Sequence, residues 1–391
     1  MNRNELVLFG LGGAGNRLVD CISQVDERFI PFYINTSLSD IQSLETYDDV
    51  DINYFSLSSQ GNGTGRSREK GKRLAGKNGY NILDIIQRFP QKNITLFSSF
   101  GGGSGSSILS VILSAIDDIK KDSGEETFDK VVNIVGILPK LNSVDLILKN
   151  TIQSWNEIMS YNCVSNMIII DNNSIINGNY LEDDEINERF AESFNSIFDI
   201  PTVNGRNFDT GNLSRLLNSK GCTYFYELPS GCESAVDALA LAEEKTILGK
   251  MYKSKEIIIK ENGLERVQCG YIGASFNDDK YDINEILYLY KPIEDKFNGY
   301  NEDKNILLIS GVLPPLNCIK KIQKELEDRE KGNNTTVSDF SKFIIDDSKF
   351  TKNNESNKQD IYQNSEINLD NKTKKKTLKK NLFDSFKKSR H

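Results

Sequence analysis

Glycine and serine residues gather in two short segments whose patterns are suited to holding phosphate. The first reads G-L-G-G-A-G-N at residues 10–16, and the second reads G-G-G-S-G-S-S at residues 101–107. Glycine allows the backbone to turn tightly enough to point several N–H groups at one anion. A helix N-terminus behind such a loop stabilises an anion by roughly 0.3–1 kcal/mol. Both segments therefore predict phosphate binding, although a serine-rich glycine turn can also be a plain connector.

Each glycine segment is flanked by the elements that such a site requires. An apolar strand pattern at residues 6–9 leads into the first segment, and a helical pattern at 17–25 follows it. The second segment lies between a strand pattern at 94–100 and a helical pattern at 108–120. Two such junctions in one parallel sheet bring both helix N-termini to the same edge, where these folds bind nucleotides.

Alternating strand and helix patterns extend this arrangement over the first half of the chain. Strands are predicted at residues 5–9, 29–35, 52–57, 94–100, 131–138 and 166–170, and helices at 81–88, 108–120 and 143–161. Such alternation is typical of a doubly wound α/β domain with a parallel sheet. A long helix is predicted next, at 184–199, because its apolar side chains recur every three or four residues.

The pattern changes after this long helix. Strands are predicted at residues 222–228, 256–260, 266–275, 285–289 and 304–312, around one helix at 234–248, which indicates a second, smaller α/β domain. The expected organisation is a nucleotide-binding domain at 1–183, a central linking helix and turn at 184–205, and the second domain at 206–330. A disordered linker and a basic C-terminal tail are expected at 331–391.

Composition excludes several classes of enzyme. The one histidine among the 391 residues is His391, the last of them, which excludes triads and metal sites that need an ordered imidazole. The six cysteines show no C-x-x-C spacing, which argues against a zinc site and a disulfide framework. The remaining chemistry uses carboxylates, amides, hydroxyls and backbone N–H groups, with a hard cation such as Mg²⁺. Because long apolar runs and a signal peptide are both absent, we expect a soluble cytoplasmic protein.

The C-terminal tail differs in charge from the rest of the chain. Residues 371–391 carry nine lysines and arginines and one acid, a charge of +8 in a chain of net charge −8, which leaves −16 on the other 370 residues. Leu378, Leu382, Phe383 and Phe386 would share one face of a helix. The tail could therefore bind DNA phosphates, anionic lipid or a groove on a partner, or remain a solvated segment that aids solubility.

Two other motifs offer different interpretations of the glycine-rich segments. Residues 10–15 also satisfy G-x-G-x-x-G, the dehydrogenase fingerprint, but Asn35 stands near the position where an acid should bind the ribose. Residues 71–78 have the spacing of a P-loop, but Asn78 replaces the Ser or Thr that coordinates magnesium. The charged residues before that motif also cannot form a buried strand. A dehydrogenase and a P-loop enzyme are therefore both disfavoured.

In combination, the glycine loops resemble those of the tubulin/FtsZ superfamily of polymerising GTPases. In that family a G-x-G-G-x-G-N loop follows the first strand and GGGTG[ST][GS] follows the fourth, and residues 10–16 and 101–107 are similar to these two loops. The segment N-T-S at 35–37 resembles the second loop, and G-N-G-T-G-R at 61–66 resembles the third, which senses γ-phosphate. The resemblance covers roughly residues 5–320 and implies a site for GTP or GDP with Mg²⁺.

The resemblance also implies which residues bind the nucleotide. Phosphate binding is assigned to the four loops, through Gly12, Gly13, Ala14, Gly15, Asn35, Gly63, Thr64, Gly65, Arg66, Gly101, Gly102, Gly103, Ser104, Gly105 and Ser106. Recognition of the guanine edge is assigned to amide and carboxylate groups, which can match its donors and acceptors. These groups belong to Asn16, to Asn172 and to Asn187 or Glu188, and Asp145 is assigned to the ribose.

Hydrolysis in this family depends on a loop that follows the long helix and enters the site of the neighbouring subunit. The loop has an N-x-D-x-x-D pattern in FtsZ-like members, whereas this chain reads N-F-D-T-G-N at residues 207–212. The resemblance implies that Asp209 polarises the attacking water and that Asn207 and Asn212 orient it. Because positioned acid–base groups contribute about 10²–10⁴-fold, loss of the second acid predicts a slow GTPase.

The basic tail favours one branch of the family. It differs from the short terminal peptide of bacterial division proteins and is similar to that of the TubZ group, the plasmid and phage segregation tubulins. We therefore predict a GTPase that forms head-to-tail cytomotive filaments and moves plasmid or phage DNA. Its tail would bind a DNA-bound adaptor, without direct sequence-specific contact to nucleic acid. The alternatives are a division-ring protein whose tail contacts the membrane, and a nucleotide-regulated filament or binding protein with little turnover.

Overall fold

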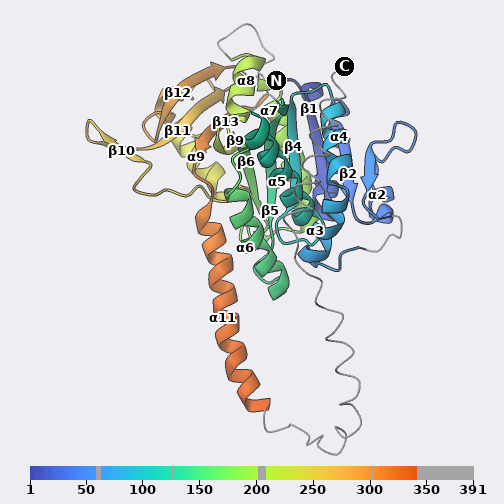
Figure 1. Cartoon of the computed structure of the whole chain (residues 1–391). Helices are drawn as coiled ribbons and strands as arrows, with labels where there is room; N and C mark the ends of the chain where they lie inside the picture. The colour runs from blue at the N-terminus through green and yellow to red at the C-terminus, as the bar shows by residue number, and fades with distance from the viewer. Residues whose placement is uncertain (59–62, 125–126, 201–207, 301–302, 341–391) are drawn as a thin grey trace, which may run out of the picture. The chain divides into compact units, whose positions relative to one another are not determined.

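One large sheet runs through the unit Met1–Leu326 (Figure 1). The computed structural model describes residues 1–58, 63–124, 127–200, 208–300 and 303–340. Within these ranges, eleven strands form the sheet. Its strand order is β10-β11-β13-β9-β6-β5-β4-β1-β2-β3, and β12 also pairs with β11. A second unit begins at Glu327.

Six parallel strands make up the N-terminal half of the sheet. They are β1 (Leu6–Leu11), β2 (Ile30–Asn35), β3 (Tyr54–Ser56), β4 (Asn93–Ser99), β5 (Val131–Leu138) and β6 (Val164–Asp171). Every residue of β1 is buried, and so are all but one of β5, as expected for strands with helices on both faces. The predicted doubly wound parallel sheet is confirmed.

The helices of this half alternate with its strands. They are α1 (Gly12–Val25), α2 (Leu38–Gln42), α3 (Arg68–Lys77), α4 (Gly79–Arg88), α5 (Gly105–Ser123) and α6 (Asp145–Met159). α1 and α5 begin inside the glycine-rich segments, earlier than predicted. α3 was not predicted, because its mostly charged sequence lacks an apolar face. Since α3 covers most of the P-loop-like motif, the rejection of a P-loop is confirmed.

The long helix α7 (Asp183–Ile197) packs its aromatic face into the core, as predicted. The Phe194 ring lies 5.6 Å from that of Phe190, 5.4 Å from that of Phe198 and 5.8 Å from that of Phe29, between ring centroids. A short hairpin of β7 (Ile175–Ile176) and β8 (Asn179–Tyr180) precedes α7, and a 3₁₀ turn (Arg3–Glu5) precedes β1.

The second half of the chain extends the same sheet. Its strands are β9 (Gly221–Leu228), β10 (Ile258–Glu261), β11 (Leu264–Ser275), β12 (Tyr290–Gly299) and β13 (Asn305–Val312). Its helices are α8 (Thr210–Leu217), α9 (Ala235–Glu244), α10 (Ile283–Ile286) and α11 (Leu316–Phe340). β9 runs parallel to β6, whereas β13 is antiparallel to β9 and to β11.

Three predictions for this half are corrected by the structure. The strand predicted at residues 285–289 is wrong, because the Asp282 side chain caps a helical turn, α10, and β12 begins only at Tyr290. The helix predicted to reach residue 248 ends at Glu244, and Leu248 instead forms a β-bridge with Ile170. α11 continues beyond residue 330 into the segment predicted as a linker. The remainder of that linker and the basic tail at 371–391 lie outside the described residues.

Two expectations from composition can be compared with the structure. All six cysteines are free thiols, in agreement with their scattered spacing. Within the described part of the chain, no helix is both long and apolar enough to cross a bilayer. His391 lies outside the described residues.

Candidate nucleotide-binding site

The first and fourth loops meet where the strand order of the sheet reverses direction. β1 lies between β2 and β4, so the loops that follow β1 and β4 flank the switch point at which doubly wound sheets bind ligands. A Cβ atom added to Gly12 would lie 2.5 Å from the Gly105 nitrogen, and one added to Gly105 would lie 2.3 Å from the Leu11 oxygen. Only glycine allows this contact, and the contact brings the N-termini of α1 and α5 together.

Neither of these two helices has a side-chain cap at its N-terminus. The N-cap residues are Leu11 for α1 and Ser104 for α5, and neither side chain accepts a bond from the first turn. In contrast, Ser67 caps α3 and Ser234 caps α9. The side chains of Leu11 and Ser104 therefore leave the first-turn N–H groups of α1 and α5 available, and a phosphate group is a suitable partner for such N–H groups. A Cβ atom on Gly13 would meet nothing within 4 Å, so the first loop is open on that side.

The second and third loops reach the same point through hydroxyl groups. The Ser104 hydroxyl lies 2.8 Å from the Thr36 hydroxyl and 3.2 Å from the Thr64 hydroxyl. Asn35 is buried and shapes the second loop, because its Oδ1 accepts the Thr36 N–H at 2.8 Å. Thr36 was not assigned to the site from the sequence, although the N-T-S segment that contains it was recognised.

The third loop packs directly on the fourth. Gly65 and Arg66 both have left-handed backbones, with φ values of 60° and 67°. A Cβ atom on Gly103 would lie 2.5 Å from both the Thr64 hydroxyl and the Arg66 carbonyl carbon. Among the described residues, no hydrogen bond uses the backbone N–H groups of Gly65 and Arg66, so both can bind an anion. Residues 61 and 62 of this loop lie outside the described residues.

The predicted base-recognition residues come from three elements. Asn16, in the first turns of α1, is 1% exposed, and within the described chain neither its Nδ2 nor its Oδ1 has a hydrogen-bond partner. Leaving a buried amide unsatisfied costs about 1–3 kcal/mol, which makes this side chain a candidate to bind a ligand atom. Asn172 follows β6, and its Oδ1 is likewise buried and unpartnered. Asn187 is half-buried on α7, where Glu188 is exposed.

α7 packs against α1, whose N-terminus carries the first loop. Burial is the main cause that raises the pKa of the Cys21 thiol on α1, and the charges of Asp20, Glu188 and Asp184 raise it further. Glu188 lies on α7, which packs against α1. Asp145, assigned to the ribose, is half-buried in the first turn of α6.

Two of the predicted catalytic residues, Asp209 and Asn212, lie far from the glycine loops of their own chain. Asp209 is the exposed N-cap of α8, and its Oδ1 accepts the Asn212 N–H at 2.8 Å. The amino group of Met1, which precedes β1, donates to the Thr210 carbonyl at this end of α8. At the C-terminal end of α8, the Asn218 Nδ2 donates to the Asn93 Oδ1 at 3.0 Å. Asn207 lies outside the described residues.

These contacts anchor α8 at the edge of the sheet where β1 and β4 begin. The glycine loops follow the opposite ends of the same strands. Because β4 has seven residues, its two ends lie roughly 20 Å apart. Figure 1 shows this separation, with α8 at one end of the parallel strands and α3 at the other. The structure therefore does not bring Asp209 and Asn212 together with the phosphate loops of the same chain.

Comparisons with known proteins agree with this architecture. Residues 5–179 match the Tubulin/FtsZ family, GTPase domain. The tubulin-like protein TubZ of Clostridium botulinum C phage is 25% identical over 380 residues, which cover 94% of this chain and 96% of that protein.

Solved structures of TubZ proteins share the fold. The crystal structure of Clostridium botulinum phage c-st TubZ superposes with a TM-score of 0.70 at 22% identity, and the alignment covers 84% of this chain and 99% of that chain. A GTPγS-form protofilament of Bacillus thuringiensis serovar israelensis TubZ gives a TM-score of 0.63 at 15% identity, over 86% of this chain and 94% of that chain. This region contains all four loops described above, so residues 5–179 form a domain that matches the Tubulin/FtsZ family, GTPase domain.

Proposed function

We propose that this protein binds GTP at the four converging loops and hydrolyses it to GDP and phosphate as it assembles into head-to-tail filaments. The observation that supports the site best is the buried Asn16 amide, which has no partner among the described residues and lies beside two uncapped helix N-termini. In this assignment the phosphates bind the glycine loops, the guanine contacts Asn16, Asn172, Asn187 and Glu188, and the ribose contacts Asp145.

We propose further that the active site is completed by the adjacent subunit. Asp209 lies near the edge of the sheet opposite the phosphate loops, so it can reach a nucleotide only from another copy of the chain. Head-to-tail stacking brings these two edges together at every interface of a filament. Asp209 then polarises the attacking water, and Asn207 and Asn212 orient it. Turnover is slow because Asn212 cannot accept a proton as a second carboxylate would.

Magnesium fits this site through oxygen ligands. Among the described residues, no group of three or more His, Cys, Asp or Glu side chains could hold a metal ion. The clustered hydroxyls of Thr36, Thr64 and Ser104 offer the hard oxygen donors that Mg²⁺ accepts alongside phosphate oxygens and water. The ion would neutralise charge on the triphosphate when bound.

Phosphate release measured over a range of protein concentrations tests the shared active site. We expect almost no release per subunit below the concentration at which the protein pellets with GTP, and a sharp rise above it. A rate per subunit that stays constant through the assembly threshold would show that one chain contains the complete site. Absence of GTP binding by the monomer would contradict the site itself.

We propose that these filaments act in the cytoplasm to segregate plasmid or phage DNA, and that the basic tail binds a DNA-bound adaptor. The support is the similarity to a phage TubZ and the +8 charge of residues 371–391. A chain ending at residue 370 should still pellet with GTP but should fail to maintain a plasmid that carries the gene and its flanking reading frames. Flotation of the full chain, but not the shortened one, with anionic vesicles would instead support the membrane-bound division-ring alternative.

A further inference from the structure

One face of α6 carries a row of polar side chains that contact the third and fourth loops. Asn150, Ser154 and Glu157 follow one another at intervals of four and three residues, which places them on the same side of the helix. The Asn150 Nδ2 donates to the Arg66 carbonyl at 3.0 Å and to the Gly101 carbonyl at 3.1 Å. A single amide therefore joins the third loop to the fourth.

Arg68 makes a second connection between these two loops. It is the first residue of α3, with one residue between it and the end of the third loop, and only 6% of it is exposed. Its Nε donates to the Ser106 hydroxyl at 3.1 Å, and its carbonyl accepts the Ser107 hydroxyl at 2.8 Å. Both ends of this residue are thus bound to the first turn of α5.

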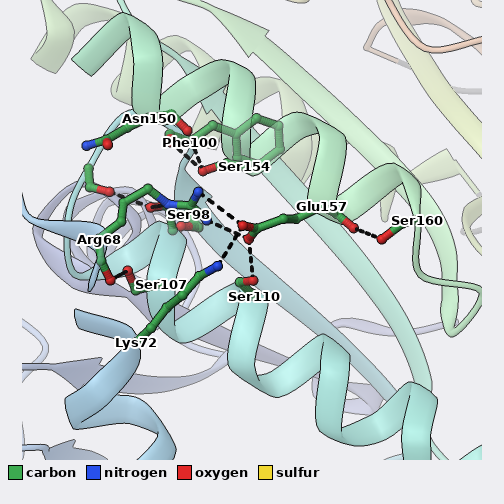
Figure 2. A network of polar contacts seen from close by, with 12 residues as sticks. Arg68, Lys72, Ser98, Phe100, Ser107, Ser110, Asn150, Ser154, Glu157 and Ser160 are labelled. Atoms are coloured by element: carbon green, nitrogen blue, oxygen red, sulfur yellow. Dashed lines mark hydrogen bonds and ion pairs between the residues drawn. The ribbon is translucent and has the colours of Figure 1, made fainter. Parts of the chain in front are cut away.

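Glu157 holds the Arg68 side chain in place. Its carboxylate accepts Arg68 Nη2 at 2.8 Å, Lys72 Nζ at 2.6 Å and the Ser110 hydroxyl at 2.5 Å. Figure 2 shows Arg68 and Lys72 converging on this carboxylate. Partial burial acts to raise the pKa of Glu157, but the hydrogen bonds from Lys72, Ser110 and Arg68 outweigh it and lower that pKa. Glu157 is therefore anionic at neutral pH.

The third loop depends on these contacts for its shape. Arg66 has a left-handed backbone that side-chain-bearing residues rarely adopt, and Asn150 binds its carbonyl. A Cβ atom on Gly63 or Gly65 would meet nothing within 4 Å, and on this side the Gly63 carbonyl accepts a bond from the exposed Lys70 Nζ at 2.9 Å. The fourth loop, in contrast, is also fixed by the contact of Gly105 with Leu11. Loosening the α6 contacts should therefore disturb the third loop more than the fourth.

We propose that Asn150, Arg68 and Glu157 are positioning residues that hold residues 63–66 of the third loop in the shape that receives the γ-phosphate. By doing so they set the preference of the site for GTP over GDP. This inference rests on the proposed function, in which the third loop faces the terminal phosphate. None of the three residues needs to contact the nucleotide.

Asn150→Asp tests the proposal, because a carboxylate cannot donate to the two carbonyls that Asn150 joins. Binding of fluorescent GTPγS and GDP would be measured below the assembly concentration. We expect the Kd for GTPγS to rise about tenfold and the Kd for GDP to change by less than about threefold. Asn156→Asp is the matched control, since it makes the same change at an exposed position of α6 and should alter neither Kd.

Glu157→Gln provides an independent variant. It removes the charge that holds Arg68 and should shift the two affinities in the same directions as Asn150→Asp. Its matched control is Glu69→Gln, an exposed α3 carboxylate that pairs with Arg73 at 3.6 Å. Thermal unfolding of each variant without nucleotide confirms that it is folded. If Asn150→Asp does not fold, Asn150→Ser replaces it, since serine is too short to join the two carbonyls.

The outcomes separate this inference from the proposed function. Folded variants that bind GTPγS and GDP equally weakly would show a merely structural role and overturn the inference. Variants with unchanged affinities would overturn it as well. Failure of the wild-type protein to bind GTPγS would instead contradict the proposed GTP site.

Discussion

At the residue scale, Asp209 caps α8 and is also the proposed catalytic residue, and different substitutions can separate these two roles. Its Oδ1 caps α8, a role that Asn performs about as well as Asp, whereas Ala at an N-cap costs about 1 kcal/mol. We therefore expect Asp209→Asn to unfold at the wild-type temperature but to lose GTP turnover by about 10²-fold in assembled protein. Asp209→Ala should lose both turnover and stability. Wild-type phosphate release by Asp209→Asn would exclude the carboxylate from the chemistry.

Asn212 stands where FtsZ-like members have a second acid, so restoring that acid should raise the rate of GTP turnover. Asn212→Asp restores the N-x-D-x-x-D pattern in the first turn of α8, where a negative charge is favourable. We expect faster phosphate release by about tenfold, with no loss of thermal stability. The measurement is turnover in pelletable filaments at equal polymer mass. An unchanged rate would mean that Asn212 does not limit hydrolysis.

Because the Asn16 amide has no described partner, replacing it should lower GTP affinity but should not lower the stability of the nucleotide-free protein. Without nucleotide, Asn16→Ala removes a buried polar group that has no described partner, so the free energy of unfolding should stay the same or rise. With nucleotide, the variant loses hydrogen bonds and its GTP affinity should fall by at least about tenfold. Urea unfolding of the nucleotide-free protein and a GTP titration check the two parts. A strongly destabilised nucleotide-free variant would point to a structural role.

At the element scale, the junction of α1 with the first loop distinguishes packing glycines from ligand-facing glycines. Gly12 has a φ of 68° and faces the Gly105 backbone, so Gly12→Ala should destabilise the fold by about 1–3 kcal/mol. Gly13→Ala places its methyl group in open space and should leave stability unchanged. If a phosphate occupies that space, Gly13→Ala should nevertheless weaken GTP binding. Thermal unfolding and nucleotide titration of both variants provide the comparison, and intact affinity in Gly13→Ala would place the phosphate elsewhere.

The helices also show why sequence patterns identify some elements and miss others. The apolar periodicity of α7 predicted both the helix and its buried face, since tertiary packing uses the same side chains. α3 has no such face and is held by Arg68 and by close contact of Gly71 with the Gly103 carbonyl, where an added Cβ would lie 2.5 Å away. Such contacts depend on residues distant in the sequence and leave no local periodic signal.

At the scale of the whole molecule, lowered acid pKa values predict how stability depends on pH. The hydrogen bond from Arg28 lowers the pKa of Asp26 most, and bonds from Lys121 and the Asn162 backbone outweigh burial and lower that of Asp117. The pKa of Glu157 is also lowered, because its hydrogen bonds outweigh the effect of burial. Each group is deprotonated more readily in the folded state, so its stabilisation is complete above the unfolded pKa of about 4 and is lost as the pH falls below it.

We therefore expect the urea midpoint to stay level from about pH 7 to pH 5 and to fall steeply below about pH 4.5. Glu157→Gln should fall less steeply, because it lacks one of the carboxylates that must be protonated. A urea midpoint that stays level down to about pH 3 would show that protonation of these carboxylates does not destabilise the fold.

The sequence alone determined the local chemistry of this protein. The glycine segments and the strands before them predicted a phosphate site in a doubly wound sheet, because turn glycines and apolar periodicity act over a few residues. Only the tertiary structure decided how the loops are joined. It brought Thr36 and Thr64 to Ser104 and placed Asn150 between two loops. It also put Asp209 at the opposite edge of the sheet, since strand order and strand direction, rather than spacing in the chain, fix which residues meet.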